Sequence, residues 1–159
     1  MNGDIVIEAS NLTKRFNGLV AVDHVNFEVR RGEIFGFLGP NGAGKTTTIR
    51  MFTGIIKPDE GSASILGYDI VREGLEAKEK MGIVPEMANA YVDLSAWDNL
   101  MLIGQLYGVP KRLREERALR LLKDLGLYER RKHIVKSFSK GMKQKLLLCM
   151  ALINDPQIL

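Results

Sequence analysis

The sequence has one cysteine and no long apolar run, and each shortage excludes a class of protein. Because Cys149 is the only cysteine, the chain has no internal disulfide, and its apolar surroundings indicate a reduced thiol within a helix. The longest strongly apolar stretch, Leu146 to Ile153, is far shorter than the roughly 20 residues that cross a bilayer. Met1 is followed by polar and acidic residues, which is not a secretory signal. We therefore expect a soluble, cytoplasmic protein that reaches a membrane only through a partner.

Length and charge indicate an ordinary globular domain. The 159 residues suffice for one domain with a real core, and the net charge of +4 is modest. Basic and acidic residues alternate over 111–132, which is typical of a solvated helix face rather than a nucleic-acid surface. Only Arg130-Arg131-Lys132-His133 forms a basic run, and it is short. We expect no nucleic-acid partner.

The centre of the sequence is a glycine-rich stretch that follows a short apolar run and leads into a predicted helix. Its pattern is Gly39-x-x-x-x-Gly44-Lys45-Thr46, the P-loop spacing in the context of strand, turn and helix. Without Cβ atoms at its glycines, the backbone can wrap around phosphates and point N–H groups inward, and the helix start adds its positive dipole end. The predicted phosphate-binding residues are Gly39, Pro40, Asn41, Gly42, Ala43, Gly44, Lys45, Thr46 and Thr47.

Two of these side chains have distinct predicted roles. Lys45 can reach the β and γ phosphates of a nucleoside triphosphate, and the Thr46 hydroxyl can ligate Mg²⁺. The alternative is a turn that merely joins a strand to a helix, but it leaves the combined match of loop, strand and helix unexplained. The loop alone does not identify the base.

Apolar periodicity and turn residues predict an α/β fold. Strands are expected at 5–12, 20–29, from Ile34, at 62–66 and 82–84, and from 157 onward, and helices at 45–53, 72–80, 95–107, about 111–125 and 140–154. Ser95 and Ser139 are expected to cap the helices that follow them. Phe16, beside the Asn17-Gly18 turn, can either stack on a base or pack against the sheet edge, and the sequence does not decide between these.

Taken together, these features resemble the nucleotide-binding domain of ABC (ATP-binding cassette) transporters over essentially the whole chain. The resemblance implies a P-loop NTPase fold of the ABC ATPase type, with an N-terminal antiparallel β-subdomain, a helical subdomain and the C-terminal part of the core missing. It divides the chain into a β start (1–33), a P-loop core (34–86), a helical subdomain (87–138) and a signature helix with the next core strand (139–159). Phe16 matches the aromatic residue that stacks on adenine.

Two matches to the family depart from its usual residues. Glu86 stands where the family has a glutamine that contacts magnesium and the attacking water; a carboxylate can ligate Mg²⁺ but cannot donate the amide hydrogen bond. An exposed acid at a strand end is the alternative. Ser139 and Gly141 match the signature motif, with Lys140 replacing its first glycine, and would face the γ-phosphate bound by a second subunit. A capped helix start is the alternative there.

The resemblance implies an ATP-binding and ATP-hydrolysing subunit that uses Mg²⁺, dimerises head to tail with a second nucleotide-binding domain and powers a transmembrane permease, as an exporter. Lys45 and Glu86 would be its catalytic residues, and the protein would lie peripherally on the cytoplasmic face of the membrane.

The family's magnesium aspartate, catalytic glutamate and switch histidine have no counterpart here; His24 and His133 match no functional position. We therefore expect little or no ATPase activity from this polypeptide alone. A soluble ABC ATPase acting on ribosomes or DNA is the alternative, while a P-loop kinase or GTPase would need motifs that we do not find.

Overall fold

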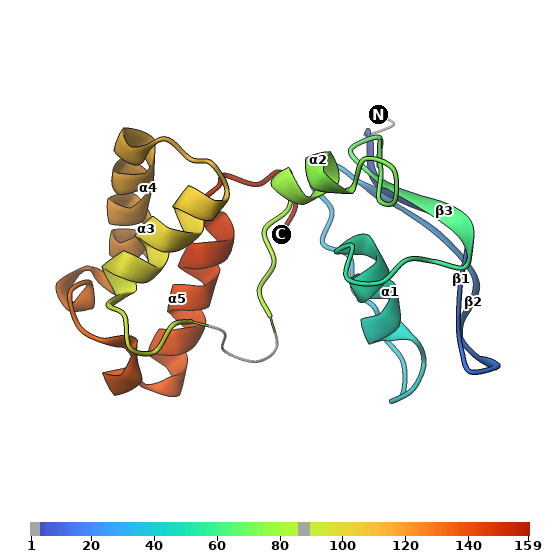
Figure 1. The fold of residues 1–159 in the computed structure, drawn as a ribbon, viewed down its shortest axis with the longest axis horizontal. Coiled ribbons are helices and arrows are strands. Elements are labelled where there is room, and N and C mark those ends of the chain that lie inside the picture. Colours follow the sequence, from blue (N-terminus) through green and yellow to red (C-terminus); the bar gives the residue numbers. More distant parts are fainter. Residues whose placement is uncertain (1–3, 86–89) are drawn as a thin grey trace. The chain divides into compact units, whose positions relative to one another are not determined.

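The computed structural model describes residues 4–85 and 90–159, in two compact units that divide after Lys78 (Figure 1). The first unit holds an antiparallel sheet and α1, Lys45–Phe52, and the second holds three longer helices. A short helix, α2 (Gly74–Glu79), lies at the division. The finer boundaries predicted at residues 34, 87 and 139 remain predictions.

The sheet is built on a long hairpin of β1, Ile5–Phe16, and β2, Leu19–Arg30. Its turn residues, Asn17 and Gly18, have φ angles of 48° and 84°. Positive φ at both central residues is what a tight hairpin turn requires, and Asn-Gly is the pair that adopts it most readily. The hairpin predicted from the sequence is therefore confirmed, with longer strands.

The other edge of β1 pairs with β3, Glu60–Ile65, which in turn pairs with β4, Tyr68–Asp69. The strand order is β2-β1-β3-β4, and every pairing is antiparallel. Buried side chains come from the sheet and from α1: Val6, Ala9, Leu12, Val22, Val29, Met51, Phe52, Ala63 and Ile65. This small core holds the glycine-rich loop in place, because the loop joins directly onto α1.

The strand predicted from Ile34 does not form. Residues 33–38 have no strand assignment, and Ile34 and Leu38 are almost fully exposed, at 103% and 95%. A buried parallel strand needs partners along its edges. No segment in the described part of the chain pairs with 33–38, which lies outside the β2-β1-β3-β4 sheet. The strand prediction is therefore wrong here, because an apolar run does not by itself provide a neighbouring strand with which to pair.

The second unit is formed by α3 (Ala96–Leu106), α4 (Lys111–Asp124) and α5 (Lys140–Leu152), with short 3₁₀ turns η1 (Tyr128–Arg130) and η2 (Val135–Ser137). Both predicted caps are present. Ser95 Oγ accepts from the Asp98 N–H at 3.0 Å, and Ser139 Oγ accepts from the Met142 N–H at 3.2 Å.

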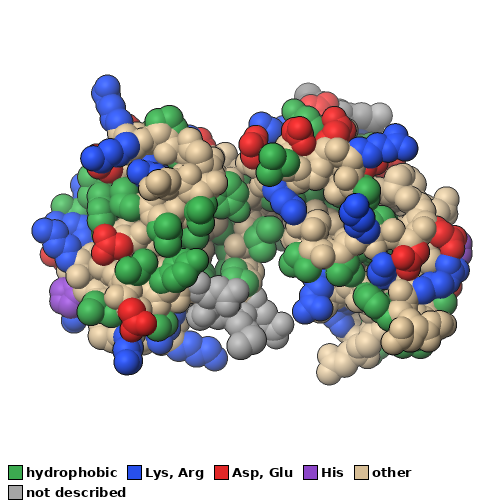
Figure 2. All heavy atoms as spheres, in the orientation of Figure 1, with side chains coloured by type: hydrophobic (Ala, Val, Ile, Leu, Met, Phe, Trp, Pro, Cys, Tyr) green, Lys and Arg blue, Asp and Glu red, His purple; other side chains and the backbone are tan. Residues whose placement is uncertain are grey.

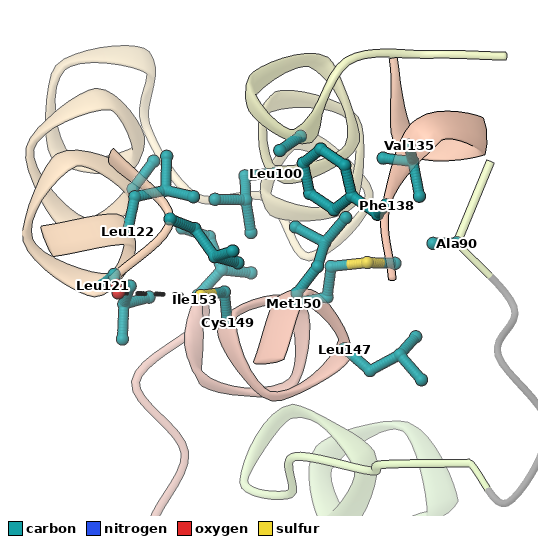
Figure 3. Packing of buried hydrophobic residues seen from close by; sticks show 14 residues of the cluster. Ala90, Leu100, Leu121, Leu122, Val135, Phe138, Leu147, Cys149, Met150 and Ile153 are labelled. Carbon is teal, nitrogen blue, oxygen red and sulfur yellow. Dashed lines mark hydrogen bonds between the residues drawn. The ribbon is translucent and has the colours of Figure 1, made fainter. Parts of the chain in front are cut away.

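The core of this unit lies between the three helices (Figure 3). Its members include Leu100 of α3, Leu122 of α4 and Leu147 of α5. Cys149 is fully buried among them, and its thiol lies 3.7 Å from the Leu121 carbonyl oxygen. Burial raises the pKa of Cys149 to about 12, so the thiol stays protonated, as expected for a reduced core cysteine.

Two further predicted strands reduce to one isolated bridge and its flanking hydrogen bonds. Met81 forms an isolated parallel bridge with Ile158, supported by the Gly82 N–H donating to the Ile158 carbonyl at 2.8 Å. Neither 82–84 nor the residues from 157 form a strand, because one bridge is too short to make a ladder. Within the described residues, no helix is long and apolar enough to cross a membrane.

Candidate functional site

The glycine-rich loop is attached to the first unit by aromatic side chains. The Phe35 ring stacks on Phe27 of β2 with centroids 5.1 Å apart, and the Phe37 ring meets Phe27 edge-on at 5.1 Å. Phe52 of α1 contacts the same ring at 5.5 Å. Such ring pairs contribute about 0.5–1.5 kcal/mol each beyond their buried area. The segment before the loop is therefore held to β2 by its rings, without a backbone ladder.

Gly44 fixes the start of α1 against β2. It has φ of 80° in the left-handed region, and a Cβ atom there would lie 2.3 Å from the carbonyl oxygen of Ala21. Only glycine fits this approach. The Gly44 carbonyl accepts both the Thr48 N–H at 2.8 Å and the Thr48 hydroxyl at 3.0 Å, which begins the helix. The last glycine of the motif thus has a structural reason independent of any ligand.

The rest of the loop is open and polar. Gly39 and Gly42 have φ angles of 153° and 85°, and the loop is closed by one hydrogen bond from the Ala43 N–H to the Pro40 carbonyl at 3.3 Å. Asn41 is exposed. The positive φ angles turn the backbone in a way that residues with a Cβ rarely adopt, and such turns direct successive amides toward one side.

Lys45 lies over this loop. Its ammonium donates to the carbonyl oxygens of Gly39 and Pro40, both at 2.7 Å, and it has no ion pair with any acid in the described part of the chain. A lysine held by two neutral carbonyls keeps its full charge available to an anion. The geometry thus places a cation beside the glycine turn, as the motif predicts.

The first turn of α1 offers free donors next to that cation. The first bond into the helix is made by the Thr48 N–H, so the amides of Lys45, Thr46 and Thr47 have no partner among the described residues. Thr46 is exposed, and no hydrogen bond involves its hydroxyl in the described part of the molecule. These amides and the dipole of α1 favour an anion at this position.

Phe16 lies at the tip of the hairpin, near the loop. It is 45% exposed and pairs with Leu19, two residues before Ala21, which lies against Gly44. At a rise of about 3.3 Å per residue, the Phe16 and Leu19 pair is roughly 7 Å along the strand from that approach. The Lys14 ammonium is 5.5 Å from the ring centroid. The ring is therefore accessible, and its stacking on a base remains a prediction.

Glu86, predicted to contact magnesium and water, lies outside the described residues. Tyr91 and Ser95, in the described segment that begins at residue 90, are held by Asn99 of α3, which is fully buried. Asn99 Oδ1 accepts from the Tyr91 N–H at 2.8 Å, and its Nδ2 donates to the carbonyls of Tyr91 at 3.0 Å and Ser95 at 2.9 Å. Sequence reasoning missed Asn99; the available signal was a polar residue beside Leu100 on the apolar side of the helix.

Ser139 and Gly141 are exposed at the start of α5 in the second unit. The Ser139 oxygen accepts the Met142 N–H, which leaves its own O–H as a donor, and nothing lies within 4 Å of a Cβ placed on Gly141. The capped-helix interpretation is thus confirmed, and it is compatible with a second role toward a phosphate, which remains a prediction.

The residues fit a magnesium ion only in part. Among the described residues, no group of three or more His, Cys, Asp or Glu is arranged to hold a metal. Mg²⁺ usually keeps several waters and binds through one or two protein oxygens plus phosphate oxygens. A single hydroxyl, that of Thr46, beside a phosphate site is consistent with that kind of coordination and not with an all-protein cage.

An open glycine turn, a lysine over its carbonyls and free amides at the following helix define a P-loop nucleotide-binding domain. Its family is given by comparison with known proteins: the profile described as "ABC transporter" matches residues 22–159. The chain belongs to the ABC transporter family, and its fold is that of the ABC ATPase domain.

Two curated relatives and one solved structure illustrate the similarity. The chain is 40% identical over 157 residues to the probable multidrug ABC transporter ATP-binding protein YbhF of Escherichia coli (99% of this chain, 27% of the relative). It is 40% identical over 154 residues to the linearmycin resistance ATP-binding protein LnrL of Bacillus subtilis (97% and 50%). A structure of an ATP-binding subunit of an ABC transporter superposes with a TM-score of 0.86 at 32% identity (95% and 63%). The chain thus spans half or less of the length of these two relatives.

Proposed function

We propose that this chain binds ATP as part of the energy-supplying subunit of an ABC transporter. The observation that carries the proposal is the position of Lys45, whose ammonium lies 2.7 Å from two loop carbonyls beside free amides at the start of α1. A triphosphate would take the place of those carbonyls as the partner of the ammonium. The exchange is favourable because a phosphate oxygen carries negative charge, which attracts the ammonium more strongly than the dipole of a carbonyl does.

The other predicted residues would act around that phosphate. The free amides of the loop and of the first turn of α1 would surround the β and γ phosphates. The Thr46 hydroxyl would supply one oxygen ligand to Mg²⁺, which neutralises phosphate charge when bound. Phe16 would stack on adenine, since its ring is exposed and close to the loop. Ser139 and Gly141 of a second copy would complete the γ-phosphate site, because a helix start favours an anion.

We propose ATP hydrolysis, with Glu86 near the attacking water, as the activity of the transporter subunit. Head-to-tail closure of two such subunits on ATP, and reopening after hydrolysis, would move a transmembrane permease. The names of the relatives support this: YbhF is described as a multidrug transporter ATP-binding protein and LnrL as a linearmycin resistance ATP-binding protein. Export is our proposal for this protein on that basis, as is attachment to the cytoplasmic face of the membrane through the permease.

Nucleotide titration tests the proposal. Isothermal titration with ATP and Mg²⁺ should show binding to the unmodified chain and a loss of roughly 10–100-fold in affinity in Lys45→Ala, the effect of removing a charge-assisted bond. Lys57→Ala is the matched control: Lys57 is an exposed lysine of the same unit, outside the loop, and its removal should leave affinity unchanged. Equal affinity in the unmodified chain and Lys45→Ala would refute the site.

A further inference from the structure

A basic segment of the second unit is not explained by the proposed function. Every charged residue from 130 to 145 is basic, and no ion pair involves any of them in the described part of the molecule: Arg130, Arg131, Lys132, Lys136, Lys140, Lys143 and Lys145. Figure 2 shows Lys and Arg side chains projecting from the surface of the unit that carries α3, α4 and α5. Like charges so close together repel each other at physiological ionic strength, where the Debye length is about 8 Å.

The backbone holds part of this segment in a fixed position. The Lys136 N–H donates to the Val92 carbonyl at 2.8 Å, and the Trp97 N–H donates to the Arg131 carbonyl at 2.8 Å. The Arg131 guanidinium lies 4.0 Å from the Tyr128 ring centroid and donates to the Tyr128 carbonyl at 2.9 Å. Residues 131–136 are thus paired with residues 92–97, and the charges stay together instead of spreading along a flexible loop.

Apolar side chains are exposed along the same pairing. Ile134 is 52% exposed, Tyr91 51% and Val92 40%. Ser95 forms an isolated bridge with Ile134, so these side chains belong to neighbouring backbone segments. Acids are present nearby at Glu129, which is exposed and adjacent to Arg130, at Asp93, which is exposed, and at Asp98, whose carboxylate accepts from the Ser95 hydroxyl at 2.6 Å. None of them forms an ion pair with the basic segment among the described residues.

We propose that the surface formed by Arg130, Lys132, Lys136, Ile134 and Tyr91 contacts anionic lipid headgroups of the membrane around the permease. Clustered cations attract an anionic leaflet, and exposed aliphatic and aromatic side chains insert at the headgroup boundary. The inference rests on the proposed function, since a subunit attached to a permease lies beside the bilayer. It adds a direct lipid contact to the attachment through the permease.

The composition favours lipid over an acidic protein segment. Lys132 and Lys136 are exposed and have no hydrogen bond from the side chain among the described residues, so each is a point charge without a fixed partner. A lysine binds phosphate as a point charge without a fixed geometry, which suits headgroups that diffuse in the leaflet. Arg131 is already held by Tyr128 and is left outside the proposed contact.

Vesicle sedimentation tests the contact directly. The whole chain is mixed with phosphatidylcholine vesicles that contain or lack phosphatidylglycerol, and the partition coefficient is measured at two salt concentrations. The test variant is Arg130→Gln/Lys132→Gln/Lys136→Gln. Each cation near an anionic surface is expected to contribute roughly five-fold to partitioning, so the triple variant should bind about 100-fold more weakly. Binding should also weaken with salt and vanish without phosphatidylglycerol.

The matched control removes the same charge elsewhere. Lys111, Arg112 and Arg120 are exposed on α4, where Glu115 and Glu116 interrupt the basic residues. Lys111→Gln/Arg112→Gln/Arg120→Gln should keep most of the vesicle binding. This result would distinguish binding by the proposed surface from a general effect of the net charge. Equal losses in both triple variants would overturn the proposal.

Nucleotide titration on the same samples separates the two proposals. Both triple variants should bind ATP like the unmodified chain, because none of their residues lies in the P-loop. If ATP binds but no variant or unmodified chain binds phosphatidylglycerol vesicles, the lipid contact is wrong and the proposed function stands. If the triple variant weakens binding to the permease in neutral lipid instead, the partner is an acidic protein segment and the lipid contact is also wrong.

Discussion

Asn99 is the buried polar side chain whose removal should cost most in the second unit. Its amide makes three hydrogen bonds, one from the Tyr91 N–H and two to the carbonyls of Tyr91 and Ser95, and no part of the residue is exposed. The change Asn99→Leu keeps a similar volume and removes all three bonds. It also releases the described segment that follows Glu86 from α3.

The size of the effect follows from these bonds. Three hydrogen bonds at about 1 kcal/mol each give about 3 kcal/mol, and the new leucine recovers part of this by apolar burial. Tyr91 is 51% exposed, so its freed backbone groups can partly bind water. We therefore expect the free energy of unfolding to fall by about 2 kcal/mol, which is large beside the 5–15 kcal/mol of a typical domain.

Trp97 provides the assay, because it is the only tryptophan and packs against the core of this unit. Urea unfolding followed by its fluorescence should show a midpoint lower by about 1 M in Asn99→Leu, at the usual slopes for small domains. Gln105→Leu is the control: Gln105 is exposed on α3 and should change the midpoint little. A change below about 0.5 kcal/mol in Asn99→Leu would refute the assigned role of the three bonds.

Three further predictions concern other parts of the chain. Gly44→Ala should lower the thermal midpoint and weaken ATP binding, because a Cβ would lie 2.3 Å from the Ala21 carbonyl oxygen at a φ of 80°. Cys149, with its pKa raised to about 12 by burial, should react with iodoacetamide at pH 8 at least about 100-fold more slowly in the folded chain than in urea. The hydrogen bond from Lys14 lowers the pKa of Asp59 from its ordinary value of 3.8. The ionised Asp59 therefore stabilises the folded chain above pH 3.8, and this stabilisation is lost as the pH falls below that value. Asp59→Asn should show less acid-induced loss of stability.

Each of these has an outcome that contradicts it. Unchanged melting and ATP binding in Gly44→Ala would mean that α1 can move away from β2. Rapid labelling of Cys149 under native conditions would mean that the helical core opens. For Asp59→Asn, a stability curve parallel to that of the unmodified chain between pH 5 and 2 would mean that the Lys14 contact does not form in solution.

Local chemistry made much of the fold predictable from the sequence. Asn17-Gly18 specified the hairpin turn, and Ser95 and Ser139 specified two helix starts, because each depends on residues close in the chain. The glycine turn of the site was predictable for the same reason. The motif places a glycine at position 44, where only a residue without a Cβ atom fits beside β2.

What the sequence could not show depends on pairing between distant segments. The apolar run from Ile34 has the composition of a buried strand, yet strand formation requires a neighbour, and no segment in the described part of the chain pairs with it. The rings of Phe35 and Phe37 pack on Phe27 instead. Asn99 was missed because a polar residue in a helix is usually exposed, and its partner Tyr91 is set by tertiary packing.

The central claim is that the backbone amides of the glycine turn and the Lys45 ammonium bind the phosphates of ATP. The most direct measurement is a set of amide ¹H–¹⁵N spectra recorded while ATP and Mg²⁺ are added. We predict that the largest shifts occur at Gly42, Gly44, Lys45 and Thr46, with smaller ones at Phe16, and that Lys45→Ala abolishes them at the same nucleotide concentration. Shifts that are absent, or that are largest outside residues 39–47, would contradict the account.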